Sequence, residues 1–224
     1  MKHNFTHFAS HLITSQGDYM KKIVLSSILA VALSQTYALA EESGAFVGVG
    51  VGYGGTQLKA EATGGPTYSL NGGGISAEVI AGYKQFFTPE FGLRYYANFA
   101  YNDSPFTENG ATTNGIFVFN YGVNVDALYN FISNETLDFG VLLGLGLGAN
   151  TWGGIDNRKL STTGFDLGLN VGVRTSIAKH HGIEVLARVP FIATTLLNES
   201  QEGISAKLSI ARQYSVGMRY IFSF

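Results

Sequence analysis

The residues of this sequence that could do chemistry are isolated acids and bases, most of them set between two apolar neighbours. The set contains Glu78, Arg94, Asp126, Asp138, Asp166, Arg174, Glu184, Arg188 and Arg219, and Lys84 belongs with them. Carboxylates near one another could serve as acid and base in glycoside chemistry. Acids and bases in similar number are more simply explained as partners in ion pairs, because buried charges are normally paired.

Histidine and cysteine chemistry finds little support. The chain has no cysteine, which excludes a thiol nucleophile and a thiolate metal site. His3, His7 and His11 have the spacing of a helix face but precede the methionine at which we expect translation to start. His180 and His181 stand in a short turn without further metal ligands. We therefore expect no enzyme activity, metal or cofactor, and a hydrolase is the least favoured alternative.

The elements that carry these charges are strands, as the end of the chain shows. Every second residue back from the C-terminus is apolar: Phe224, Phe222, Tyr220, Met218, Val216 and Tyr214. Arg219 lies at the centre of the opposite set, among small and polar residues. Successive side chains of a β-strand point to opposite faces, so one face here suits lipid and the other holds the charge.

The same alternation predicts eight strands. They run over 44–57, 74–86, 90–102, 116–131, 136–150, 163–177, 183–196 and 205–224. Long loops follow the odd-numbered strands, at 55–73, 103–115, 151–162 and 197–204, and short turns follow the even-numbered ones. An even strand number with alternating loop lengths is typical of bacterial outer-membrane barrels. We predict an all-β fold over 41–224, an eight-stranded antiparallel transmembrane β-barrel with its long loops on the exterior.

The composition of the polar face indicates that it points inward. A soluble barrel such as a lipocalin would place its apolar residues inside and its polar residues in water. Here the polar set is largely glycine with isolated charges, which suits the narrow interior of an eight-stranded barrel. We predict a lumenal network in which Arg219, Arg188 and Arg174 pair with Glu184, Asp166 and neighbouring carboxylates. This network would plug the barrel, and a narrow porin-like channel is the alternative.

The start of the chain predicts export. Residues 20–40 contain a basic stretch, a short apolar stretch and the sequence Ala38-Leu39-Ala40, which are the three parts of a cleavable helical signal peptide. Residues 1–19 are interpreted as an upstream extension that is not part of the fold. The chain carries a net charge of −2, and the leader holds three of its lysines, so the remainder is more acidic still. An acidic chain argues against nucleic acid as a partner.

These features together resemble a known family. The signal peptide, the Gly-Val alternation from Val47, the strand pattern and the Tyr220-Ile-Phe-Ser-Phe224 ending are similar to small Helicobacter outer-membrane proteins of the Hop/Hor type, and to OmpA-like and opacity-like eight-stranded barrels. The resemblance implies a monomer in the bacterial outer membrane. Periplasmic chaperones and the barrel assembly machinery would deliver it, reading Tyr220, Phe222 and Phe224. Lipid, lipopolysaccharide and a host molecule at the loops are the partners it implies.

The signal peptide yields the first prediction. We expect N-terminal sequencing of the protein taken from its native membrane to begin at Glu41, because cleavage follows Ala38-Leu39-Ala40. A first residue at Met1 or Met20 would contradict both the cleavage and the export that it predicts.

Overall fold

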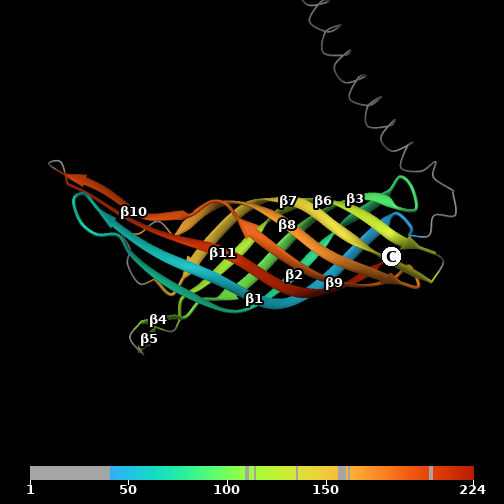
Figure 1. Ribbon diagram of the computed structural model, residues 1–224, viewed down its shortest axis with the longest axis horizontal. Helices are drawn as coiled ribbons and strands as arrows, with labels where there is room; N and C mark the ends of the chain where they lie inside the picture. Colours follow the sequence, from blue (N-terminus) through green and yellow to red (C-terminus); the bar gives the residue numbers. More distant parts are fainter. Residues whose placement is uncertain are drawn as a thin grey trace, which may run out of the picture. The chain divides into compact units, whose positions relative to one another are not determined.

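A computed structural model of the chain describes residues 41–108, 111–113, 115–134, 136–155, 160, 162–201 and 204–224 (Figure 1). The signal peptide over 20–40, its cleavage residues Ala38 and Ala40, and the extension over 1–19 lie outside the described residues. Within the described part, no helix is long and apolar enough to cross a membrane.

The described chain is built from antiparallel strands. They are β1 (Gly44–Ala62), β2 (Tyr68–Phe86), β3 (Phe91–Asp103), β4 (Phe106–Glu108), β5 (Ala111–Thr113), β6 (Phe117–Ser133), β7 (Leu137–Gly153), β8 (Thr163–Ile177), β9 (His181–Pro190), β10 (Thr194–Gln201) and β11 (Ile204–Ser223). Around the wall the order is β1-β11-β9-β8-β7-β6-β3-β2, and β2 pairs with β1 to close the ring. The predicted eight-stranded antiparallel barrel is thus confirmed, with β10 continuing the seventh wall strand and β4–β5 forming a small outer hairpin.

The strands are longer than predicted at one end of the barrel. The expected loop over 55–73 is mostly ladder, because β1 continues to Ala62 and β2 begins at Tyr68. In the expected loop over 197–204, the described residues 197–201 and 204 likewise belong to the β10–β11 ladder. The prediction of irregular loops was wrong in both places. Outside the membrane a ladder needs no apolar face, so polar pairs such as Glu61 opposite Lys207 continue it without an alternating pattern.

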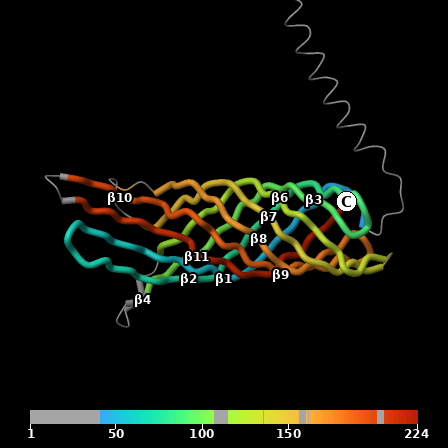
Figure 2. The backbone as a smooth tube through the Cα atoms, turned by 45° about the horizontal axis from the view of Figure 1, so that its top comes forward, coloured from blue at the N-terminus to red at the C-terminus, as the bar shows by residue number. Residues whose placement is uncertain are grey.

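The two ends of the barrel differ in length. The short turns at 87–90, 134–136 and 178–180 lie at the end where the chain finishes. At the opposite end the β1–β2 and β10–β11 hairpins run on past the other strands (Figure 2). The short turns therefore mark the periplasmic end, and the long hairpins mark the exterior.

The outer surface of the wall is apolar. The alternating set faces outward, so that Val51 is 69% exposed and Ile75 is 73% exposed. Aromatic side chains gather towards both ends of the strands, with Tyr101, Phe117 and Phe119 packed together on one side. A soluble monomer rarely exposes a continuous apolar surface of this kind, whereas a transmembrane barrel requires it. The apolar face lies outside and the charged face inside, as predicted.

Three β-bulges interrupt the alternation. The register passes from Gly55 opposite Tyr214 to Thr56 opposite Arg212, which leaves Gln213 as an extra residue in β11. Extra residues also occur in β6 at Phe131 and in β10 at Leu196. A bulge reverses which face the following side chains meet. In β11 the inward-facing side chains are therefore odd-numbered on the C-terminal side of Gln213, as at Arg219, and even-numbered on its N-terminal side, as at Arg212.

Glycines on the inner face allow close approach of neighbouring strands. Gly122 of β6 and Gly148 of β7 are direct partners in the ladder. A Cβ added at Gly148 would lie 2.8 Å from the Cα of Gly122, which is closer than real Cβ contacts. The close approach of strands in the curved wall, and not a need for a flexible chain, therefore requires glycine at these positions.

We expect Gly148→Ala to lower the free energy of unfolding by about 1–3 kcal/mol, the usual cost of overpacking. Gly65→Ala is the matched control, because its added Cβ would lie 3.7 Å from the nearest atoms. Urea unfolding of the protein in lipid vesicles measures both. Equal stability of the two variants would contradict a wall that is closely packed at Gly148.

The lumenal charge network as a candidate functional site

The lumen is filled by side chains in successive layers along the barrel axis. Charged groups form a periplasmic layer, a middle layer and an outer layer, and buried apolar clusters lie among and beyond them. The layers combine contacts between neighbouring strands, such as Arg94 with Asp126, and contacts across the bore, such as Arg94 with Glu184. The network therefore ties opposite sides of the barrel together.

The periplasmic layer is organised around Glu41. Its carboxylate accepts hydrogen bonds from Arg174 at 2.6 and 2.7 Å, from Lys84 at 2.8 Å and from Asn130 at 3.2 Å. Burial by itself would raise the pKa of Glu41, but the adjacent Arg174 and Lys84 lower it to about 2. Glu41 precedes β1, so these hydrogen bonds hold the start of the described chain inside the periplasmic end of the barrel.

The middle layer is centred on Arg94 of β3. Its guanidinium donates to Glu184 of β9 at 2.5 Å and to Asp126 of β6 at 2.7 Å. The rings of Tyr96 and Phe46 lie 5.0 and 5.5 Å from its charged carbon, within cation–π range. Arg94 is only 2% exposed, yet it is compensated by two carboxylates and two aromatic rings.

A second pair in this layer crosses β1. Arg219 of β11 donates two hydrogen bonds to the Glu78 carboxylate of β2, and its Nη1 lies 3.9 Å from Glu184. Between them in the ladder stands Gly50, opposite both residues. A Cβ on Gly50 would come within 2.8 Å of the Glu78 side chain. The glycine therefore provides the space through which the two charges meet.

The outer layer combines one ion pair with several asparagines. Arg188 donates to Asp166 at 2.6 Å and to Asn170 and Asn124 at 2.9 and 3.0 Å. Asp166 also accepts from Asn150 at 3.0 Å. Asn170 in turn donates to Asp126 at 3.2 Å, which joins this layer to the middle one. The amides bond to Asp166 and to Nη1 of Arg188, whereas the Nε of Arg188 has no partner among the described residues.

Apolar clusters lie around the charged layers. At the outer end, a cluster consists of Phe106, Val118, Trp152, Leu196 and Ile210. Two smaller clusters contain Phe86, Leu128 and Leu142, and Phe46, Ile80, Tyr96 and Ile221. The sequence pattern concealed them, because single large apolar residues among inward-facing glycines and charges look like exceptions to the alternation. In the structure they close off the bore around the ion pairs.

The predicted lumenal residues all lie inside the barrel, but they are not all joined. Arg219, Arg188 and Arg174 each contact a carboxylate. Asp138 stands apart and accepts a hydrogen bond from Ser133 at 2.7 Å. Sequence reasoning missed Glu41, which was interpreted only as the first residue after cleavage. It also missed Arg212, which the bulge at Gln213 turns inward.

The predicted assembly residues are on the outer face of the last strand. Phe222 packs against Phe224 with ring centroids 5.3 Å apart, and Phe224 donates its backbone N–H to Ala45 at 3.0 Å. His181, the first residue of β9, bonds the Tyr220 hydroxyl at 2.6 Å. The end of the chain is thus held in the wall at the periplasmic rim.

Comparison with known proteins gives a match to one family. A family model described as "Helicobacter outer membrane protein" matches residues 78–224, from the middle of β2 to the last residue. A comparison with curated proteins found no matching relative.

Among solved structures, the chain is similar to three outer-membrane proteins. It is 19% identical to Neisserial surface protein A, covering 82% of this chain and 100% of that one with a TM-score of 0.42. It is 13% identical to OprG from Pseudomonas aeruginosa, and the match covers 82% of this chain and 98% of that one with a TM-score of 0.48. It is 16% identical to Ail, the attachment invasion locus protein of Yersinia pestis, and the match covers 80% of this chain and 99% of that one with a TM-score of 0.34.

We expect Glu184→Ala to lower the free energy of unfolding by roughly 3–5 kcal/mol, because it leaves the buried Arg94 without its closest carboxylate. Glu199→Ala removes an exposed carboxylate from β10 and should change stability by less than about 0.5 kcal/mol. Fluorescence of the single tryptophan, Trp152, reports unfolding in urea with lipid vesicles. Equal midpoints for both variants would mean that the lumenal charges are solvated independently.

Proposed function

This chain belongs to the Helicobacter outer membrane protein family, and from that premise we propose that it is a non-conducting structural barrel that displays its outer hairpins at the cell surface. It is an integral protein of the bacterial outer membrane whose long hairpins face the exterior. The observation that carries the proposal is the filling of the lumen by paired charges and apolar clusters.

Two spaces between the lumenal side chains of the described residues are small, which supports a closed lumen. One cavity of about 40 Å³ lies between the middle and outer layers, and one of about 10 Å³ lies beside Glu41 and Arg174. A single water needs about 10–15 Å³ on this measure, so the two cavities together hold only a few waters. Hydrated ions need a continuous wide path, which the porins obtain with sixteen or more strands.

The outer hairpins supply the surface that such a barrel would display. Between β1–β2 and β10–β11 lies an apolar groove of about 290 Å³, lined by residues such as Tyr68, Leu197 and Leu208. Lys207 and its ladder partner Glu61 also line it. Apolar walls suit the acyl chains of a lipid, so we include lipopolysaccharide among the partners. A host molecule at the same hairpins, monomeric state and delivery by the assembly machinery remain part of the proposal.

We also propose that the protein is not an enzyme. Apart from Asp138, which accepts a hydrogen bond from Ser133, the lumenal carboxylates that could act as acid or base are engaged by cations, as Glu184 is by Arg94. His180 and His181 bond the last strand through Ser223 and Tyr220. A catalytic base must be able to reach its substrate, and these groups are committed to holding the wall together.

Planar-bilayer recording tests the closed lumen. We expect the purified wild-type protein to give no stable single-channel steps. The double variant Glu78→Ala with Arg219→Ala removes both members of one ion pair, and should give small steps because it empties part of the bore without stranding a charge. Heat-modifiable gel migration confirms that each sample is folded. Stable, large steps from the wild type would reverse the proposal in favour of a pore.

A further inference from the structure

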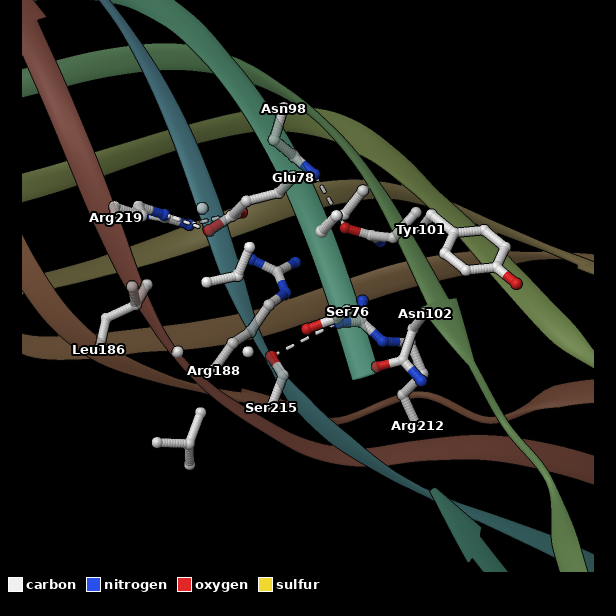
Figure 3. Close-up of a pocket in the computed structure, with 18 of the residues that line it drawn as sticks. Ser76, Glu78, Asn98, Tyr101, Asn102, Leu186, Arg188, Arg212, Ser215 and Arg219 are labelled. Carbon is white, nitrogen blue, oxygen red and sulfur yellow. Dashed lines mark hydrogen bonds and ion pairs between the residues drawn. The ribbon is translucent and has the colours of Figure 1, made fainter. Parts of the chain in front are cut away.

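Arg212 is a buried cation placed in the lumen by a bulge. Simple alternation from Phe224 would put it on the lipid face, but the extra residue Gln213 turns it inward opposite Thr56. Its side chain is directed among Ser76, Ser215 and Arg188 (Figure 3). Only 6% of Arg212 is exposed, so its charge is almost fully removed from solvent.

The guanidinium of Arg212 lacks an anionic partner in the described part of the chain. Its Nε and Nη1 have no hydrogen-bond partner there, and its Nη2 reaches only the Ser215 hydroxyl at 3.5 Å. Asp166 and Glu78 attract it from a distance, while Arg188 repels it. Both acids are already bound to other arginines. The other lumenal cations form ion pairs, but no ion pair offsets the free energy that is lost when Arg212 is removed from water.

The space beside Arg212 is the 40 Å³ cavity. Ser76, Ser215 and Asn102 line it together with Arg212 and Arg188. The hydroxyl of Thr56, the ladder partner of Arg212, is buried and also without a partner in the described residues. The cavity thus combines an unpaired guanidinium with two serine hydroxyls, which are donors suited to an anion, and the Glu78 carboxylate that also lines it is already paired with Arg219.

We propose that this cavity binds one small oxyanion of the phosphate class. An anion compensates the buried charge of Arg212, which neutral water cannot do. The volume fits about three water-sized positions, or one inorganic phosphate, and is too small for a lipid headgroup. The Oδ1 of Asn102 is an unpartnered acceptor on the same wall, and the P–OH of hydrogen phosphate can donate to it. A halide has no such donor.

The test uses the full mature protein, refolded in detergent with and without inorganic phosphate so that access to the lumen does not limit binding. Isothermal titration or equilibrium dialysis with phosphate, at constant ionic strength, should show one saturable site per chain. Phosphate should also raise the urea midpoint, because a ligand that binds only the folded state stabilises it. Chloride at the same concentration should do neither.

Two variants make the assignment specific. Arg212→Gln should weaken phosphate binding at least about tenfold, the loss of one charge-assisted contact. Lys179→Gln removes a cation from the short turn at the opposite end of the barrel, away from the cavity, and should bind as the wild type does. If Arg212→Gln does not refold, Ser76→Ala keeps the charge and should weaken binding several-fold. No phosphate binding by the wild type, binding unaffected by these lumenal variants, or equal binding of chloride would each overturn the proposal.

Discussion

A strand in lipid has no water to satisfy its backbone, and this constraint determines the rest of the structure. The sheet can meet it only by closing, which it does through the ladder from Phe46–Ser223 to Ala62–Ala206. Closure separates the lipid outside from the bore inside, and successive side chains of each strand face one and then the other. The apolar residues must then face lipid, and the charged ones must enter a bore only wide enough for side chains.

Most charges confined in that bore meet a charge of opposite sign. Arg94 of β3 reaches Glu184 of β9 across the barrel, and Arg219 of β11 reaches Glu78 of β2 across β1. Such pairs add little net stability compared with an apolar core, but breaking one is costly. They therefore penalise any displaced register, since a shift by one residue would turn each charge towards lipid.

Much of this arrangement could be predicted from alternation alone. The strand number, the inward direction of Arg219 and the depth it shares with Glu184 all follow from counting residues by twos. Counting fails where the ladder gains a residue, so Arg212, which lies beyond the bulge at Gln213, was not among the predicted lumenal charges. It also fails outside the membrane, where the hairpins need no apolar face. The choice of partner, such as Glu41 for Arg174, depends on wall curvature that no local pattern contains.

The burial of Arg94 implies that this side chain loses its hydration when the barrel closes. Before the strands join, Arg94, Glu184 and Asp126 can be hydrated, and hydrated charges favour the solubility of a chain with many apolar residues. Their mutual bonds span residues 94 to 184 and form only when opposite sides of the sheet meet. The charges that favour solubility in transit thus become the interior of the finished barrel, and their dehydration accompanies its closure.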